Sequence, residues 1–261
     1  MKLTALALIA STALVSASDV FPIVEVDSND LIGAYTGGKW LVSEKAAKLV
    51  KPGTNYRVYS LTRDLGKAQG GKPTPGADVC PEVFTVELSP KNEKGVIAIA
   101  APWNALPRTP RLADITQPIY TQAAREFLQS RGIKEPKVKI TKIVRIDLEG
   151  DGEEEVLVSA TNYFTKDHIP SSAPAGSYSF VLLRRVVGGK VRTRLIEGDF
   201  YPNAKTFNAP AAYEVSAVLD LDGDGKLEVV VRGDYYEGAW TTIYRCTPTK
   251  IEELLVVSCG V

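Results

Sequence analysis

The sequence predicts a mainly β protein with one or two short helices. Its 261 residues include 21 Gly and 16 Pro, which break the chain into short segments and favour strands over long helices. The segments 56–61 and 83–88 alternate apolar and polar residues, as half-buried strands do. In the C-terminal half, one pattern occurs twice: an acidic, glycine-containing loop between two apolar strands. We therefore expect antiparallel β units joined by turns.

The overall composition excludes several classes of protein. Hydrophobic residues make up 44% of the chain and charged residues 24%, so a core can form and global disorder is excluded. The 31 Lys and Arg residues balance 31 Asp and Glu residues, and the pI is about 6.6. Such a chain lacks the basic footprint that binds duplex nucleic acid or an anionic membrane. We expect no nucleic-acid partner.

The first 17 residues have the pattern of a secretory signal peptide. Lys2 provides a positive charge, residues 3–14 are apolar and uncharged, and small residues follow at 15–17. The apolar run is shorter than the roughly 20 residues that a transmembrane helix needs. We expect cleavage after Ala17, a secreted or periplasmic location, and no membrane insertion.

Three cysteines in an exported chain allow at most one internal disulfide plus one free or intermolecular thiol. Residues 247–250 read as a hairpin turn, which places Cys246 opposite Ile251. Cys259 lies eight residues further on, roughly 26 Å along a strand, whereas a disulfide needs Cα atoms within about 7 Å. This favours a Cys80–Cys259 bridge, with a chain that has no bridge as the alternative.

The N-terminal region, residues 18–115, reads as short strands separated by loops. Strands are expected at 56–61, 83–88 and 96–100, with a loop rich in Gly, Lys and Pro at 66–78. A short helix is expected over 43–50, capped by Ser43.

A helix and connector are expected over residues 116–135. Pro118 suits the first turn of a helix over 118–131, and Gly132 ends it. Ile119, Ala123 and Phe127 would share one face, which we interpret as contact with the core rather than with a partner.

The C-terminal region, residues 136–261, contains an internal repeat. Residues 143–158 align with 216–231: an apolar strand, a loop with the pattern acid-x-acid-Gly-Asp-Gly-x-x-Glu, and a second apolar strand. The similarity continues from 162–164 to 234–236 and from 176–178 to 238–240. A longer loop in the first copy, which contains His168, separates the last two segments. Two copies of one β unit are therefore expected.

The loop of the second copy has the composition of a calcium site. Its alternate acids can direct oxygens toward one point, while Gly223 and Gly225 provide the positive φ angles of a tight loop. The ligands expected in this loop are Asp220, Asp222, Asp224, the carbonyl of Lys226 and Glu228. This all-oxygen set suits Ca²⁺, whereas zinc prefers Cys or His. The alternative is an ordinary Asp-Gly hairpin turn, which does not need so many acids.

The loop of the first copy is a weaker version of the same site. Its expected ligands are Asp147, Glu149, Asp151, Glu153 and Glu155. Glu149 replaces the middle Asp, and its longer side chain can crowd an ion. An EF-hand is excluded for both loops, because its twelfth position holds a bidentate Glu and helices flank it. Here the twelfth residues are Val158 and Val231, and the flanks are β-branched.

The strand–loop–strand unit resembles the FG-GAP/VCBS repeats of integrin-α-like propellers and bacterial exported proteins, over about residues 143–258. In that family such loops bind calcium and the repeats form blades of an antiparallel β-propeller. The resemblance implies ligands at Asp220, Asp222, Asp224 and Glu228, and at Asp147, Glu149, Asp151 and Glu155 in the first copy. The mature chain is too short for seven blades, so a partial or smaller propeller-like assembly is expected.

Evidence for catalysis is sparse in the sequence. His168 is the only histidine, and no nucleophile-elbow, phosphate-binding or dinucleotide motif accompanies it. Several aromatic residues follow the acidic hairpins and are interpreted mainly as core: Tyr163, Phe164, Tyr235, Tyr236 and Trp240.

Three functions therefore remain open. The first is a secreted calcium-binding module with structural Ca²⁺ that binds a macromolecule, either a protein or a polysaccharide. The second is a carboxylate-based hydrolase, acting for example on carbohydrate, built on the same scaffold. The third is a structural or surface component with no dedicated ligand.

Overall fold

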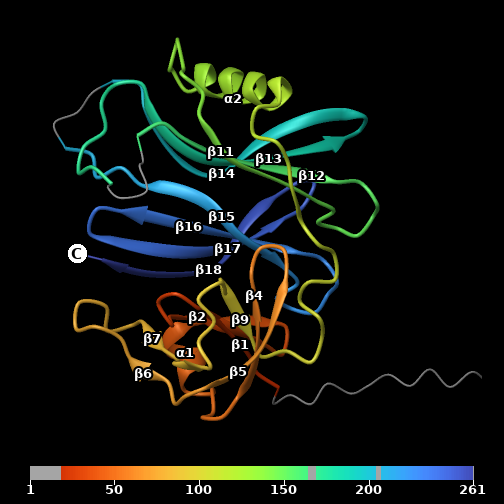
Figure 1. Ribbon diagram of the computed structural model, residues 1–261, viewed down its shortest axis with the longest axis vertical. Coiled ribbons are helices and arrows are strands. Elements are labelled where there is room, and N and C mark those ends of the chain that lie inside the picture. The colour runs from red at the N-terminus through yellow and green to blue at the C-terminus, as the bar shows by residue number, and fades with distance from the viewer. Residues whose placement is uncertain (1–18, 164–168, 204–206, 261) are drawn as a thin grey trace, which may run out of the picture.

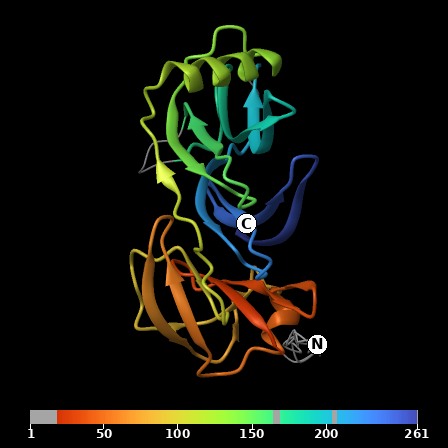
Figure 2. The same cartoon turned by 90° about the vertical axis from the view of Figure 1, so that its right-hand side faces the viewer.

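Three antiparallel β-sheets stack on one another in the computed structural model, which describes residues 19–163, 169–203 and 207–260 (Figures 1 and 2). The N-terminal sheet lies at one end, the sheet β15–β18 in the middle, and the sheet β10–β14 beyond it, covered by α2. In the described part of the chain no sheet closes on itself. The mainly β prediction is confirmed at this level. The expected signal peptide and His168 lie outside the described residues.

The N-terminal sheet has the strand order β3-β2-β1-β9-β4-β5-β8. Its strands are β1 (Phe21–Glu25), β2 (Leu31–Thr36), β3 (Lys39–Val42), β4 (Asn55–Tyr59), β5 (Asp64–Gly70), β8 (Leu88–Ser89) and β9 (Ile97–Ile99). The short helix α1 (Ser43–Ala47) follows β3, and β6 (Thr74–Pro75) pairs with β7 (Phe84–Thr85). The predicted strands at 56–61 and 96–100 are confirmed as β4 and β9.

Three local predictions in this region need correction. Ser43 is the first residue of α1 rather than its cap, and its hydroxyl accepts a hydrogen bond from the Phe84 N–H at 2.9 Å. The segment 83–88 is not one strand, because β7 pairs with β6 whereas β8 pairs with β5. The expected loop at 66–78 contains most of β5 and all of β6. In the last two cases, pairing with strands outside the predicted segment decides the conformation.

The two segments aligned in the sequence form hairpins in two separate meanders. The first sheet comprises β10 (Arg111–Leu112), β11 (Ile140–Ile146), β12 (Glu155–Thr161), β13 (Ser177–Val187) and β14 (Lys190–Tyr201). The second comprises β15 (Ala212–Leu219), β16 (Glu228–Tyr235), β17 (Gly238–Cys246) and β18 (Ile251–Gly260). The short strand β10 precedes the domain boundary expected at residue 115, yet it pairs with β11.

The middle sheet is buried on both faces. Val229 and Val231 of β16 pack toward the β10–β14 sheet, whereas Val230 packs toward the N-terminal sheet. This explains why β16 reads as a continuous apolar run rather than as an alternating strand. The β15–β16 loop is consequently held between the other two sheets at its base.

Helix α2 (Pro118–Ser130) covers the outer face of the β10–β14 sheet, but with a different face from the predicted one. Its buried residues are Tyr120, Ala124 and Leu128, and Phe127 packs beside them. Ile119 is 61% exposed, so the predicted row Ile119, Ala123 and Phe127 lies one residue away from the core row.

The predicted disulfide is confirmed. Cys80 bonds to Cys259 across 179 residues, with their Cα atoms 5.6 Å apart. Cys246 is buried and free, and it lies opposite Ile251 as the hairpin turn predicts. The bridge ties the end of β18 to the N-terminal region.

Candidate metal centre

Each acidic loop connects the two strands of one hairpin. The first loop follows β11 at Ile146 and ends where β12 begins at Glu155. The second follows β15 at Leu219 and ends where β16 begins at Glu228. The last acid of each motif is therefore the first residue of a buried strand, which fixes its carboxylate at the base of the loop.

The second loop folds around the side chain of its first acid. Asp220 accepts hydrogen bonds from the Gly223 N–H at 2.7 Å and the Gly225 N–H at 3.1 Å. Both glycines have positive φ, +79° and +84°, a conformation that other residues adopt only with strain. Asp224 accepts a further hydrogen bond from the Lys226 N–H at 2.8 Å. The glycines thus let the backbone turn around the acids.

Three aspartates of the second loop gather their oxygens. One carboxylate oxygen from each of Asp220, Asp222 and Asp224 lies within 4.8 Å of the others. Ligands on opposite sides of a calcium ion are about 4.6–5.2 Å apart, because Ca–O distances are about 2.3–2.6 Å. The spacing therefore fits a shared calcium ion. Among the described residues this is the group of His, Cys, Asp or Glu side chains that can hold a metal.

Glu228 closes the base of the second loop. Its side chain is fully buried; it accepts a hydrogen bond from the Leu221 N–H at 3.0 Å, and Arg245 of β17 donates to it at 3.3 Å. Burial, followed by the charge of Asp222, raises the pKa of Glu228 to about 8. Burial also raises the pKa of Asp220 and Asp222, and nearby carboxylates add to the shift. Without a bound cation, ionisation of all the carboxyl groups in this loop is therefore unfavourable.

The first loop has a similar backbone but a different arrangement of acids. Asp147 accepts hydrogen bonds from the N–H groups of Gly150 at 2.6 Å, Gly152 at 2.8 Å and Asp151 at 3.2 Å. Burial opposes ionisation of Asp147, but these donors outweigh it and lower its pKa. Asp151 accepts from the N–H of Glu153, a predicted ligand whose side chain is exposed. The backbone of the loop thus provides the hydrogen bonds that the Asp147 carboxylate needs.

A buried arginine pairs with Glu149 and Glu155 of the first loop. Arg185 of β13 pairs with Glu149 and, at 2.8 Å, with Glu155, and its side chain is only 3% exposed. Glu155 also accepts the Leu148 N–H at 2.9 Å, as Glu228 does with Leu221. The other oxygen of Glu149 is buried without a hydrogen-bond partner among the described residues. Glu149 is therefore drawn toward Arg185 rather than grouped with Asp147 and Asp151.

Two residues from the connector between the N-terminal sheet and β10 support both loops. Arg108 donates to the carbonyls of Asp147 at 2.7 Å, Leu148 at 3.1 Å and Gly225 at 2.9 Å. Trp103 donates from its indole N–H to the Asp220 carbonyl at 2.9 Å. Sequence reasoning missed these two residues because they lie far from the motifs.

Sequence reasoning also missed Arg185 and Arg245, which pair with the acids of the two loops, although the sequence contains a signal for them. Val156 pairs with Arg184 and Val229 pairs with Tyr244, so Arg185 and Arg245 stand at the matching register of the two hairpins. The signal is a pair of arginines 60 residues apart, which match only when the offset of 62 between 176–178 and 238–240 is shortened by two residues.

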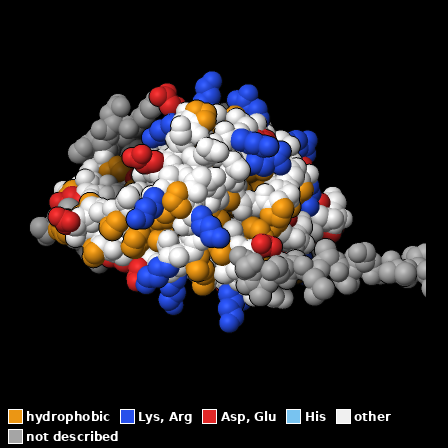
Figure 3. Space-filling view, turned by 90° about the horizontal axis from the view of Figure 1, so that it is seen from below, with side chains coloured by type: hydrophobic (Ala, Val, Ile, Leu, Met, Phe, Trp, Pro, Cys, Tyr) orange, Lys and Arg blue, Asp and Glu red, His pale blue; other side chains and the backbone are white. Residues whose placement is uncertain are grey.

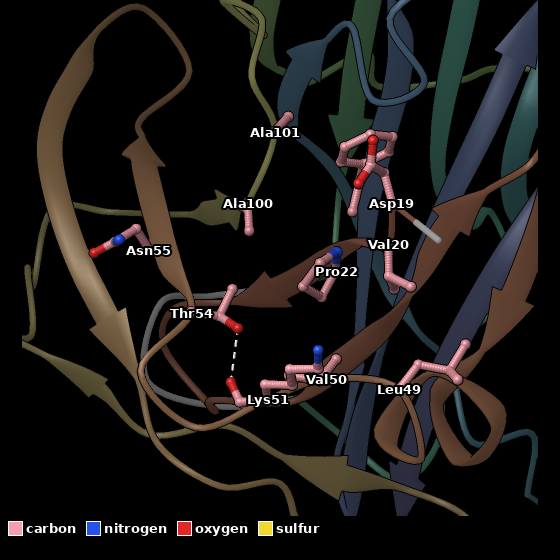
Figure 4. Close-up of a pocket in the computed structure, with 11 residues that line it drawn as sticks. Asp19, Val20, Pro22, Leu49, Val50, Lys51, Thr54, Asn55, Ala100 and Ala101 are labelled. Carbon is pink, nitrogen blue, oxygen red and sulfur yellow. Dashed lines mark hydrogen bonds between the residues drawn. The ribbon is translucent and has the colours of Figure 1, made fainter. Parts of the chain in front are cut away.

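One cavity in the N-terminal region has no part in the acidic loops. It measures about 340 Å³ and lies between β1 and the segment around Lys51 (Figure 4). Thr54 donates to the Lys51 carbonyl at its floor. Asp19 is the one carboxyl group among the described residues that lines it, so these residues bring no carboxyl pair together there. At the same end of the molecule, hydrophobic side chains form small groups between Lys and Arg side chains (Figure 3).

A second cavity, of about 300 Å³, brings Glu25 and Asp30 together. Glu25 accepts from Arg232 at 2.7 Å, Thr241 at 2.7 Å and Ser28 at 2.8 Å. These donors occupy both of its oxygens. Glu25 therefore serves as an ion-pair link between β1 and the middle sheet rather than as a free acid or base.

None of the helices in the described residues is long and apolar enough to cross a membrane. In comparisons with known proteins, the chain matches no family model, no curated protein and no solved structure.

Proposed function

We propose that this chain is a calcium-binding β-repeat protein in which one Ca²⁺ ion stabilises the β15–β16 hairpin of a binding module. The observation that supports the proposal is the grouping of the Asp220, Asp222 and Asp224 oxygens within 4.8 Å above a buried Glu228. Hard oxygen donors at this spacing suit calcium. The ion would add to the positive charge that Arg245 already provides to Asp222 and Glu228.

The residues that would hold the ion are Asp220, Asp222, Asp224 and Glu228, with the carbonyl of Lys226 as a further donor. Arg245 already pairs with Asp222 and Glu228, so it would share these carboxylates with the ion. Trp103 and Arg108 hold the loop backbone from the outside, which keeps the donors together. In this proposal the calcium ion is structural, and the two meanders are blade-like repeats that carry binding surfaces.

The experiment is a thermal-unfolding measurement of the mature chain in chelator and in about 1 mM calcium. If Kd is about 10⁻⁴ M, as in extracellular modules, calcium stabilises the folded state by about 1.4 kcal/mol. For a chain of this size, 1.4 kcal/mol corresponds to a rise in the melting midpoint of about 3–6 °C. Magnesium should give a smaller rise because it demands octahedral geometry and dehydrates reluctantly. Identical midpoints in chelator and in calcium would refute the metal assignment.

A further inference from the structure

A small pocket lies at the opposite end of the β15–β16 hairpin from the acidic loop. It measures about 180 Å³ and lies where β15 and β16 meet β11 and β12. Ala212 pairs with Asp234 at this end, whereas Leu219 pairs with Glu228 at the loop end. Seven residues of strand separate the two ends, about 23 Å. The polar residues that line the pocket are Thr141, Thr161, Glu214, Ser216, Arg232 and Asp234.

Buried hydroxyl groups of the β10–β14 sheet face the free edge of β15. Ser159 accepts a hydrogen bond from the Val215 N–H at 3.2 Å, and Ser179 accepts one from the Tyr213 N–H at 2.9 Å. Thr161 stands directly opposite Ser179 in the sheet and is 4% exposed. Its hydroxyl has no hydrogen-bond partner among the described residues, although it lines the pocket. A buried hydroxyl without a hydrogen-bond partner is unfavourable, so we expect the Thr161 hydroxyl to bond to a ligand inside the pocket.

The charged groups around the pocket already have partners. Arg232 donates to both oxygens of Asp234, at 2.9 and 3.1 Å, and to Glu25 at 2.7 Å. Lys142 pairs with Glu214. An ionic ligand would have to displace one of these ion pairs. What remains available is neutral hydrogen bonding: the Thr161 hydroxyl, the acceptor lone pairs of Thr141 and Ser216, and the outer carboxylate lone pairs.

We infer that this pocket binds one neutral sugar unit at the end of a glycan. A sugar ring offers several hydroxyls that both donate and accept, which matches the Thr161 hydroxyl and the surrounding acceptors. The volume is below the roughly 300–1,000 Å³ of pockets that hold drug-sized ligands, so the space suits a single ring. Thr141 and Glu214 are exposed, so the pocket opens to solvent and the rest of a glycan can extend outward.

This inference rests on the proposed function only in treating the chain as a binding module, and it names the ligand of that module. The test is calorimetry and ligand-observed NMR of the mature chain with neutral monosaccharides: glucose, galactose, mannose and N-acetylglucosamine. At least one should bind with a Kd on the order of 1 mM, as expected for a ligand of this size. Putrescine and inorganic phosphate serve as ionic comparison probes.

Thr161→Val separates the ligand site from the fold. The substitution replaces the unpartnered hydroxyl with a methyl group of the same shape, so the melting midpoint should stay the same or rise slightly. Sugar affinity should fall about 5–10-fold, which corresponds to the loss of one hydrogen bond. Thr242→Val is the matched control, because Thr242 is equally buried on β17 but does not line the pocket. Its sugar affinity should remain unchanged.

Two results would overturn the inference: no neutral sugar binds, or binding is the same in Thr161→Val and in the native chain. Preferential binding of putrescine or phosphate would equally refute a neutral-sugar site. The calcium-induced rise in melting midpoint is measured on the same samples. Its persistence after a failed sugar titration would leave the calcium proposal intact, and its loss would not affect the sugar result.

Discussion

The two acidic loops share one sequence pattern but handle their charge differently. In the second loop, Asp220, Asp222 and Asp224 bring their oxygens within 4.8 Å of one another, and Arg245 beside them is 29% exposed. In the first loop, Glu149 reaches Arg185, which is almost completely buried. The middle acid is Asp222 in the second loop and Glu149, which is one methylene group longer, in the first. The second loop forms a cluster of acids that suits a cation, whereas the first is held by a buried arginine. The comparison teaches that acid spacing alone does not define a calcium site.

Removing the two arginines provides the strongest test of this difference. Arg185→Gln leaves Glu149 and Glu155 without their cation and should destabilise the protein by about 3–5 kcal/mol, as the loss of one partner of a buried ion pair does. Arg245→Gln also leaves buried acids, but there calcium can supply the charge. Urea unfolding in chelator and in calcium should show that calcium reverses most of the Arg245→Gln loss and little of the Arg185→Gln loss. Equal rescue of both variants would mean that both loops bind the cation alike.

The pH dependence of the metal-free protein should separate the loops further. The pKa of Glu228 is raised from 4.5 to about 8, so the folded state holds a proton that the unfolded chain has released. Stability in chelator should therefore decline as pH rises from about 4.5 to 8. The pKa of Asp147 is lowered, so its contribution is present above pH 3.8 and is lost as pH falls further.

Unfolding in chelator across this pH range gives the measurement, and Glu228→Gln is the control. That variant should lose most of the decline between pH 4.5 and 8, because its side chain does not titrate. A metal-free protein whose stability is flat or rises across this window would contradict the raised pKa of Glu228.

Matched alanine substitutions test which loop responds to calcium. The Asp224 side chain is exposed and accepts a hydrogen bond from the Lys226 N–H. Asp151 occupies the same position in the first loop and accepts a hydrogen bond from the Glu153 N–H. If the second loop binds calcium as proposed, Asp224→Ala should abolish most of the stabilisation of about 1.4 kcal/mol expected from about 1 mM calcium at a Kd near 10⁻⁴ M. Asp151→Ala should leave most of it. Melting curves with and without calcium give the answer, and the reverse pattern would assign the ion to the first loop.

Exchanging the middle acids, Glu149 and Asp222, should make the calcium affinities of the two loops more alike. Glu149→Asp shortens the side chain that reaches Arg185 and should create or strengthen a second calcium site. Asp222→Glu should weaken calcium binding at the proposed second-loop site about 10-fold, or by about 1.4 kcal/mol. Calcium titration by calorimetry reports both affinity and stoichiometry. An unchanged stoichiometry in Glu149→Asp, together with unchanged affinity in Asp222→Glu, would show that side-chain length is not the deciding feature.

Sequence patterns predicted features that depend on neighbouring residues. The hairpin turn at 247–250, the end of α2 at Gly132 and the positive φ angles of Gly223 and Gly225 all follow from local chemistry. The disulfide between Cys80 and Cys259 followed from excluding a local pairing by distance. Predictions failed where two elements compete for the same residues. The segment 83–88 divides between two pairings, and the core face of α2 is set by the sheet beneath it.

The sequence by itself determined the mainly β character and the backbone of the two acidic loops. These depend on apolar runs, glycines and acids within nine residues of one another, so short-range sterics and hydrogen bonds suffice. Only the tertiary structure decided how each loop is neutralised and supported. Arg185 and Arg245 come from a third strand, and Trp103 and Arg108 from a distant connector. Their placement depends on how three sheets stack to bury apolar faces, and no spacing within a loop encodes that.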